Sequence, residues 1–237
     1  MKKALLLLLC GGYSLTVAAQ TGAWIRKSDI GSLLPAGPRG KSNAVGFAIG
    51  NRGYVGTGLE STLTNTDGQT RDFYAYDPAT GSWTKRADFG GDPRTWAAGF
   101  SIGGKGYIGT GADSTVTSYR SDFWEYDSAT DSWSQKADFG GGARFAAVGF
   151  SIGGKGYIGT GRYQGEDKSD LWQYDTAANT WTRKADFGGG ARWGAVGFNI
   201  GDKGYIGTGN DQAGAYNADF WEYDPATDAW TRKADFG

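Results

Sequence analysis

Short runs of alternating apolar and polar residues, separated by glycine-rich turns, fill the chain from about residue 41 to its last residue. In the run 171–175, the alternation places Trp172 and Tyr174 on one face of a strand and the other side chains on the opposite face. The triplet 153–155 (Gly-Gly-Lys) lies between two such runs, and glycine allows the positive φ that a tight hairpin requires. The pattern therefore predicts antiparallel β-strands joined by short turns.

These predicted strands belong to a repeat. The segment 154–161 recurs with small changes at 51–58, 104–111 and 202–209, and each copy is followed by an Asp-aromatic run and then by a tryptophan. These tryptophans stand at 83, 133, 181 and 230. In the third unit, four strands are predicted, at 145–152, 156–161, 171–175 and 181–185. The units cover about 39–89, 94–139, 144–187 and 192–236.

Four short antiparallel strands in each repeat are typical of a propeller blade, so the sequence predicts an all-β fold, a β-propeller. The order of residues within each unit resembles the kelch repeat: an arginine, an apolar strand, a Gly-Tyr-Ile-Gly strand, a Tyr-Asp-Pro-Ala-Thr turn and a tryptophan. The Gly-Gly doublets at 103–104 and 153–154 lie one strand earlier than is usual for kelch. The resemblance covers 41–237 and implies a secreted bacterial member of the galactose-oxidase/kelch-like superfamily.

The number of strands bears on how the ring closes. Residues 24–29 align with 230–235, so the chain holds five tryptophan strands and only four Gly-Tyr strands. The resemblance implies that an N-terminal strand often completes the last blade, yet the fourth unit already has its own strand at Trp230. We therefore expect four four-stranded blades plus one N-terminal closing strand at 24–29, in an incomplete arc of a six- or seven-bladed ring. A closed four-bladed ring with a spare strand is the alternative.

The first 19 residues have the features of a signal peptide. Lys2 and Lys3 precede an apolar run that starts at Ala4, and small residues at 17–19 suit cleavage before Gln20. The run is shorter than the roughly 20 residues that span a bilayer. A lipoprotein signal at Cys10 fits less well, because the preceding leucine is too large. We expect a mature propeller segment, 20–237, that is secreted, periplasmic or at the cell surface, with no integral membrane segment after cleavage.

Composition excludes several chemistries. The chain has no histidine, and its one cysteine lies in the predicted signal peptide. Disulfides and thiolate metal sites are therefore excluded from the mature chain, as are a Ser-His-Asp triad and the histidine-ligated copper of galactose-oxidase-like enzymes. A net charge of −1 gives no electrostatic basis for binding nucleic acid. No run of carboxylates resembles a calcium loop. We expect no cofactor, no metal and no nucleic-acid partner.

One face of the predicted propeller combines variable loops with basic residues. Antiparallel connections place the loops at 59–71, 112–121, 162–169 and 210–218 on the same face as the links into the first strands. These links carry one basic residue each: Lys41, Arg94, Arg144 and Arg192. A ring of arginines suits carboxylates or acidic peptides. The stronger interpretation is structural, with each arginine paired to a neighbouring aspartate such as Asp138 or Asp186, since repeated positions serve blade stacking.

Aromatic residues beside these arginines vary between units and complete a candidate ligand-binding site. They are Trp96, Phe145 and Trp193, and a variable loop adds Arg162 and Tyr163. Such rings stack on sugars or pack in the interior, and packing is the stronger interpretation. No catalytic residue is singled out, because the spacing of the loop acids selects no pair for glycoside hydrolysis. Those acids are Glu60, Asp67, Asp113, Glu166, Asp167 and Asp211.

Kelch propellers include galactose-oxidase-like enzymes, sialic-acid mutarotases and pure interaction modules, so the resemblance alone does not settle function. We expect a non-catalytic binding scaffold for a protein or a glycan, at the face with the variable loops. The alternative is a sugar mutarotase or another carbohydrate-active propeller enzyme. A third possibility is a purely structural array within a larger surface protein.

Overall fold

A computed structural model describes residues 25–30, 40–60 and 68–237 of the chain, and these residues form strands and no helix. The predicted signal peptide and Trp24 lie outside them.

Four antiparallel sheets of four strands each follow one another along the chain, and we call them blades 1 to 4. Blade 1 has β2 (Val45–Ile49), β3 (Arg52–Gly56), β6 (Phe73–Asp77) and β7 (Ser82–Arg86). Blade 2 has β8 (Ala98–Ile102), β9 (Lys105–Gly109), β10 (Phe123–Asp127) and β11 (Ser132–Lys136). Blade 3 has β12 (Val148–Ile152), β13 (Lys155–Gly159), β16 (Leu171–Asp175) and β17 (Thr180–Lys184). Blade 4 has β19 (Val196–Ile200), β20 (Lys203–Gly207), β22 (Phe220–Asp224) and β23 (Ala229–Arg232).

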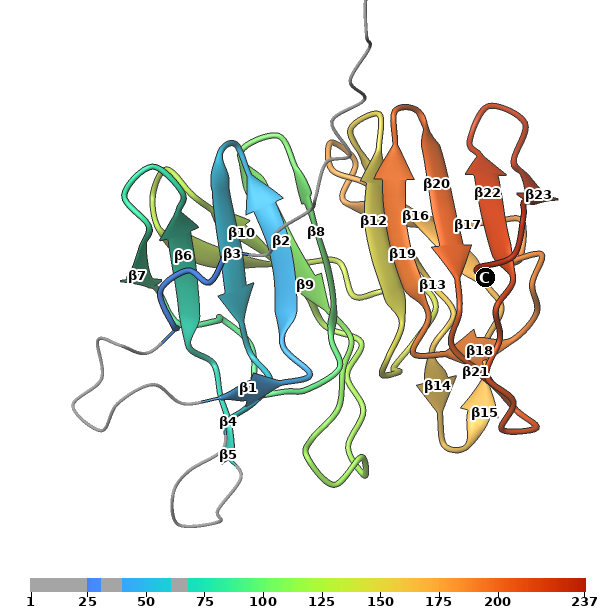
Figure 1. Ribbon diagram of the computed structural model, residues 1–237, viewed down its shortest axis with the longest axis horizontal. Helices are drawn as coiled ribbons and strands as arrows, with labels where there is room; N and C mark the ends of the chain where they lie inside the picture. The colour runs from blue at the N-terminus through green and yellow to red at the C-terminus, as the bar shows by residue number, and fades with distance from the viewer. Residues whose placement is uncertain (1–24, 31–39, 61–67) are drawn as a thin grey trace, which may run out of the picture.

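The blades pack face to face in chain order around a central axis (Figure 1). Their first strands lie innermost, with β2 against β8, β8 against β12 and β12 against β19. Within each blade the four strands run antiparallel from the axis outward, as a meander. The predicted all-β propeller fold is confirmed.

Two strands of the third blade are shorter than predicted, because the backbone turns at defined residues. Strand β12 begins at Val148 rather than at 145, since Ala146 has a φ of +52° and cannot continue a strand. Strand β13 ends at Gly159 rather than at 161, because Thr160 has a φ of +57°. Both turns recur at the same positions in the other blades.

Adjacent blades interlock through apolar side chains and glycines. Val45 of blade 1 fills the space above Gly99 of blade 2, where an added Cβ would lie 2.3 Å from a Val45 methyl. The ring of Phe100 in blade 2 covers Gly156 of blade 3 in the same way, again at 2.3 Å from an added Cβ. Glycine weakens a strand but permits this close approach of two sheets. The repeated glycines therefore set the spacing between blades.

Hydrogen bonds along the outer edges also tie each blade to the preceding one. The indole N–H of Trp133 donates to the carbonyl oxygen of Ala87, in the blade before, at 3.1 Å. Asp131, in the same turn as Trp133, accepts from the Ala87 N–H at 3.0 Å and from the Tyr126 hydroxyl at 2.7 Å. Blades 3 and 4 repeat both arrangements, with Asn179 in place of the aspartate in blade 3.

The N-terminal segment 25–30 lies beside blade 1 in the place that a preceding blade would occupy. Trp83 donates to the carbonyl oxygen of Ser28 at 2.8 Å, which is the bond that Trp133 makes to Ala87. The predicted strand at 24–29 is not formed over residues 25–29, which pair with no strand among the described residues. A β-strand at this position would pair with the third strand of a preceding blade, as the fourth strand does in each blade described. The described residues contain no such preceding blade, and the segment contacts only the outer edge of blade 1.

At one end of the molecule the connections between blades form small ladders. Strand β1 (Lys41–Ser42) pairs with β4 (Leu59–Glu60), which also pairs with β5 (Gly68–Gln69). Strand β14 (Arg162–Tyr163) pairs with β15 (Glu166–Asp167), and β18 (Arg192–Trp193) with β21 (Asn210–Asp211). The predicted variable loops thus contain short strands. We call this end, at the bottom of Figure 1, the loop face.

Candidate functional site

The loop face carries both the variable connections and the links into the first strands, as predicted. A backbone turn after the second strand of blades 1 to 3 joins the variable connection to the link into the next blade. In blade 3, Thr160 has a φ of +57° and the following Gly161 a φ of +92°. The Gly161 N–H then donates to the carbonyl oxygen of Arg192, in the link to blade 4, at 2.8 Å. A β-branched residue with positive φ is strained, so this turn is held by its surroundings.

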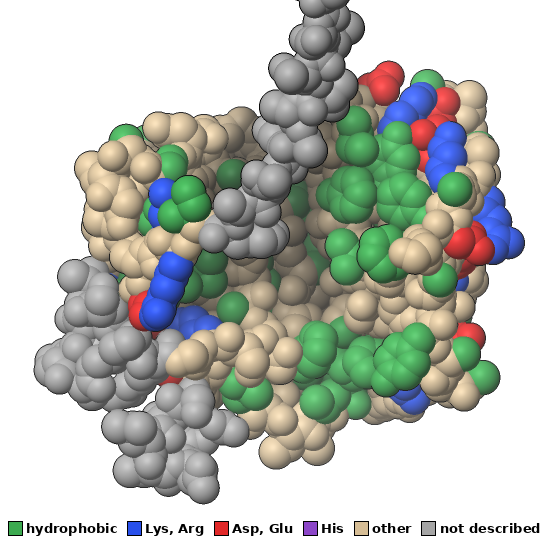
Figure 2. All heavy atoms as spheres, in the orientation of Figure 1, with side chains coloured by type: hydrophobic (Ala, Val, Ile, Leu, Met, Phe, Trp, Pro, Cys, Tyr) green, Lys and Arg blue, Asp and Glu red, His purple; other side chains and the backbone are tan. Residues whose placement is uncertain are grey.

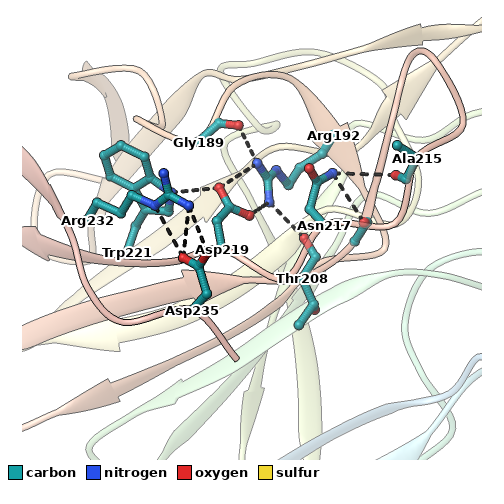
Figure 3. Close-up of polar contacts among 10 residues, drawn as sticks. Gly189, Arg192, Thr208, Ala215, Asn217, Asp219, Trp221, Arg232 and Asp235 are labelled. Carbon is teal, nitrogen blue, oxygen red and sulfur yellow. Dashed lines mark hydrogen bonds and ion pairs between the residues drawn. The ribbon is translucent and has the colours of Figure 1, made fainter. Parts of the chain in front are cut away.

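The arginine in each link is buried and paired with an aspartate of its own blade. Arg192 forms a bidentate ion pair with Asp219, with Nη–Oδ distances of 2.6 and 3.0 Å (Figure 3). It also donates to the carbonyl oxygens of Thr208 and Gly189. The indole N–H of Trp221 donates to the same aspartate at 2.7 Å. Each guanidinium therefore joins the end of the second strand to the start of the third.

The same arrangement holds in the preceding blades. Arg94 pairs with Asp122 at 2.6 Å through both oxygens, and Arg144 pairs with Asp170 at 2.5 and 2.9 Å. Each guanidinium also lies over a phenylalanine ring, at 4.8 Å from the centroid of Phe89 in the case of Arg94. In blade 1 a lysine takes the place of the arginine. Lys41 donates to Asp72 and Thr70 at 2.6 and 2.7 Å.

Burial makes these basic residues part of the fold. The exposed fractions of Arg94, Arg144 and Arg192 are 0%, 1% and 1%. A ligand on the loop face therefore meets none of the three guanidinium groups directly, which favours the structural interpretation of the arginine ring. The aspartate partners precede the third strands and are neither Asp138 nor Asp186. Their constant distance of 11 positions from the tryptophan of the fourth strand (Trp133, Trp181 or Trp230) is the signal in the sequence that points to them.

The ion pairs also fix the charge of the aspartates. Burial by itself would raise the pKa of Asp170, but the hydrogen bonds and the positive charge of Arg144 outweigh it and hold that pKa below its usual value. Asp122 and Asp219 have lowered pKa values for the same reasons, with Arg94 and Arg192 as partners. All three carboxylates are therefore ionised at neutral pH.

The aromatic candidates lie together on the loop face, with a ring that sequence reasoning missed. The Trp96 and Trp193 rings are 6.3 Å apart, and Phe145 lies 6.0 Å from Trp193. Tyr119 stacks on Phe145 at 6.0 Å and meets the edge of Tyr163 at 5.1 Å. Phe145 is buried and the other four rings are half-buried. With Arg162, which lies 5.9 Å from the centroid of Trp193, these five rings form what we call the loop-face cluster.

The loop-face cluster borders a hollow at the mouth of the central axis. This hollow has a volume of about 200 Å³ and is lined mainly by small residues of the links. Trp96 forms part of its wall, and Gly194, which follows Trp193, forms another part. In this view the hydrophobic side chains at the lower centre gather around β18 and β21 (Figure 2). The loop-face cluster therefore reaches a small concave opening through one ring, that of Trp96.

One carboxyl group on this face has an unusual environment. The side chain of Asp167 is completely buried, and neither carboxyl oxygen accepts a hydrogen bond within the described residues. The nearest cation is Arg162, whose Nε lies 3.5 Å from Oδ1. Burial raises the pKa of Asp167 and the charge of Asp211 adds to the effect, while Arg162 opposes it. The protonated form of Asp167 is therefore favoured relative to that of a solvated aspartate.

Among the described residues, no group of three or more acidic, cysteine or histidine side chains is placed to hold a metal ion. The same part of the chain contains no helix that is long and apolar enough to cross a membrane.

No protein-family model matches the sequence, and no curated protein matches it. Solved structures do match the fold. One of them, titled "Structure of YjhT", superposes on this chain with a TM-score of 0.70 at 21% sequence identity. The match covers 86% of this chain and 68% of that chain, so about a third of the other chain has no counterpart in the match. At this identity the similarity shows a shared propeller fold and carries no information about a ligand.

Proposed function

We propose that this protein is a secreted, kelch-type propeller that acts as a non-catalytic binding scaffold, with its ligand on the loop face. The loop-face cluster is the observation that carries the proposal. Four of its rings are half-buried, and one of them, Trp96, lines an open hollow. Connections of different length support the cluster, and loops on a rigid scaffold are where binding residues concentrate.

A glycan suits this surface better than an acidic peptide does. Aromatic faces stack on the apolar faces of sugar rings, and the half-exposed Arg162 supplies donors at the edge of the cluster. The arginines that would attract an acidic peptide are buried in ion pairs. The predicted signal peptide would bring the protein to a compartment where glycans are exposed. A protein ligand on the same surface is the other outcome that the test below distinguishes.

The test is binding of the mature chain to arrays of glycans and of peptides, followed by calorimetry with the best ligand. Tyr163→Ala and Arg162→Ala are expected to weaken binding about tenfold each, which corresponds to about 1.4 kcal/mol. Tyr216→Ala is the matched control, since this side chain is 89% exposed on the loop face and outside the cluster. Unchanged affinity in both cluster variants, with unchanged melting temperatures, would contradict the proposed site.

Asp167 supports a second candidate function, a sugar mutarotase. Mutarotation opens and closes a sugar ring and needs only a group that gives and takes a proton. Burial favours the protonated form of the Asp167 carboxyl, so this group is a candidate proton donor. Asp167 follows Glu166 on β15 and pairs in register with Arg162, which places it beside the loop-face cluster.

Mutarotation of free sugars, followed by polarimetry or NMR, tests this alternative. Asp167→Asn is expected to abolish any acceleration that the protein causes. Glu166→Gln is the matched control, because this neighbouring acid is exposed and its pKa is lowered by Lys168. If the protein gives no acceleration over buffer, or if Asp167→Asn retains it, the enzyme reading fails and the binding scaffold stands alone.

A further inference from the structure

Blade 4 exposes side chains whose counterparts in the earlier blades are buried or half-buried against the following blade. Val196, Phe198 and Ile200 on β19 are 58%, 41% and 62% exposed. Their counterparts on β12 are Val148, Phe150 and Ile152, with exposed fractions of 3%, 3% and 5%. In Figure 2 the apolar side chains at the upper right lie over the strands of blade 4. We call the surface formed by Val196, Phe198, Ile200 and Phe236 the blade 4 face.

Phe236 completes this surface at the outer end of the blade. It is 74% exposed, whereas Phe187, at the same position in blade 3, is 3% exposed and packs edge-on against Trp230 at 4.9 Å. An apolar hollow of about 540 Å³ lies between Phe198 and Phe236. Four of the six exposed large hydrophobic side chains among the described residues belong to the blade 4 face. Exposed apolar area concentrated in this way marks an interaction surface.

Blade 1 shows the complementary surface at the other end of the arc. Gly46 and Gly53 occupy the positions of Gly149 and Gly156, which are covered by blade 2. An added Cβ at Gly53 would meet no atom nearer than 4.0 Å, and one at Gly46 none nearer than 3.7 Å, among the described residues. Neither glycine has a φ that requires glycine. Blade 1 therefore has the glycine positions that receive a preceding blade, without that blade.

A second copy of the chain does not fit between these two surfaces. Within this chain, the indole N–H of Trp230 donates to the carbonyl oxygen of Ala185 in the preceding blade. If blade 4 of one copy stacked on blade 1 of another, the Ala234 carbonyl would have to meet Trp83 in the same way. In this chain, the indole N–H of Trp83 is already bound to Ser28. The Ser28 hydroxyl also donates to the Gly81 carbonyl at 2.5 Å. The segment 25–30 thus occupies the place that the outer strand of the second copy would need.

We propose that the blade 4 face is a docking surface for a further blade of the same repeat, supplied by the same polypeptide. That blade carries glycines at the positions of Gly149 and Gly156, to receive Val196 and Phe198. Its tryptophan donates to the Ala234 carbonyl. The blade that finally reaches blade 1 contributes only three strands, because the segment 25–30 already occupies the position of its fourth strand.

The experiment extends the chain with a blade of its own sequence. A copy of residues 141–185, which holds all four strands of blade 3 with Trp181, is joined after Gly237 to the full chain. Docking is expected to raise the melting temperature by about 4 °C or more, through burial of apolar surface, and to reduce binding of an apolar dye. The matched control is the same extension with valine at the copied positions 149 and 156, which closes the space for Val196 and Phe198.

A second variant keeps the test decisive if the extension does not fold well. Phe198→Ser is expected to lower the melting temperature of the extended chain more than that of the present chain, where the Phe198 ring packs on Tyr205 and Phe220 of its own blade. An equal effect in both chains, or an equal gain from the valine extension, would overturn the proposal. So would sedimentation showing a dimer of the present chain that Phe198→Ser dissociates, since the occupant would then be a second copy.

Discussion

The indole N–H of Trp83 donates to the carbonyl oxygen of Ser28 at 2.8 Å, across 55 positions of sequence. This bond reproduces, at the first blade, the contact that Trp133, Trp181 and Trp230 make to the blade before them. The N-terminal segment therefore acts as a fragment of a blade, even though it forms no strand.

Deleting residues 25–30 from the mature chain is expected to destabilise it by about 1 kcal/mol, because the two exposed hydrogen bonds that Ser28 makes with blade 1 are lost. Chemical denaturation, monitored by tryptophan fluorescence, measures the change. Ile25→Ser is the control, since this side chain is 73% exposed, and it is expected to leave stability unaltered. A deletion without effect would show that the Ser28 contact adds nothing to the fold.

Gly81→Asp is expected to stabilise the protein. Gly81 has a φ of +66°, and the equivalent Asp131 and Asp228 adopt φ values of +52° and +51°, so aspartate is compatible with this turn. The hydroxyl of Tyr76 is buried without a hydrogen-bond partner among the described residues. A carboxylate at 81 would accept from it, as Asp228 accepts from Tyr223 at 2.7 Å. A gain of about 1 kcal/mol corresponds to about 2–4 °C in melting temperature, and Gly81→Asn is a useful comparison.

Arg144→Ala is expected to cost about 3–5 kcal/mol, because it leaves the mostly buried Asp170 carboxylate without its partner. Arg183→Ala removes an ion pair with Asp186 that is about half exposed, and it is expected to cost less than about 1 kcal/mol. Urea denaturation of the two variants compares them directly. Similar losses in both would mean that the buried arginines have no special place in the fold.

Gly156→Ala and Gly53→Ala test the spacing of the blades at equivalent positions. The added methyl at 156 would lie 2.3 Å from the ring of Phe100, so overpacking is expected to cost about 1–3 kcal/mol. At 53 the methyl meets open space, and alanine in place of glycine is expected to be neutral or slightly stabilising. Thermal unfolding distinguishes the two outcomes, and a large loss at 53 would indicate that blade 1 is covered in solution.

Stability is expected to be flat from pH 5 to 8 and to fall below about pH 4. The chain has no histidine to titrate in the neutral range. The pKa of Asp170 is lower in the folded chain than in the unfolded chain, so the unfolded chain binds a proton first as the pH falls. The ion pair of Asp170 therefore contributes to stability above about pH 4, and this contribution is lost at lower pH. Burial raises the pKa of Tyr174 to about 12, so stability is also lost above about pH 10. Denaturation midpoints across this range, with Asp170→Asn as comparison, check both limits.

The repeat made most of the fold predictable from the sequence. Alternation and glycine turns locate β12, β13, β16 and β17 to within a few residues, because each strand is short and its turn residues recur in every unit. The ends of β12 and β13 were misplaced because Ala146 and Thr160 adopt positive φ, which neither residue type signals. Tertiary contacts of the links impose that backbone.

The candidate site was harder to predict for a physical reason. Whether an arginine binds a ligand or a neighbouring aspartate depends on burial, and Arg144 looks the same in the sequence in either case. The aromatic residues Trp96, Phe145 and Trp193 were identified because they vary where the rest of the repeat does not. The contacts of the Tyr119 ring and the burial of the Asp167 side chain depend on how separate connections pack against one another. No local pattern in the sequence encodes that packing.

The contact between blades is nearly the same at each of its three occurrences, with an apolar side chain from one blade above a glycine of the next. Such an interface gives a blade little means to distinguish its proper neighbour from any other copy. The order of the blades along the polypeptide, rather than differences between their contact surfaces, then decides which blade stacks on which. During synthesis at high concentration, blades of different molecules can therefore exchange places, and rapid stacking of successive repeats is what protects the chain from assembling into mixed arrays.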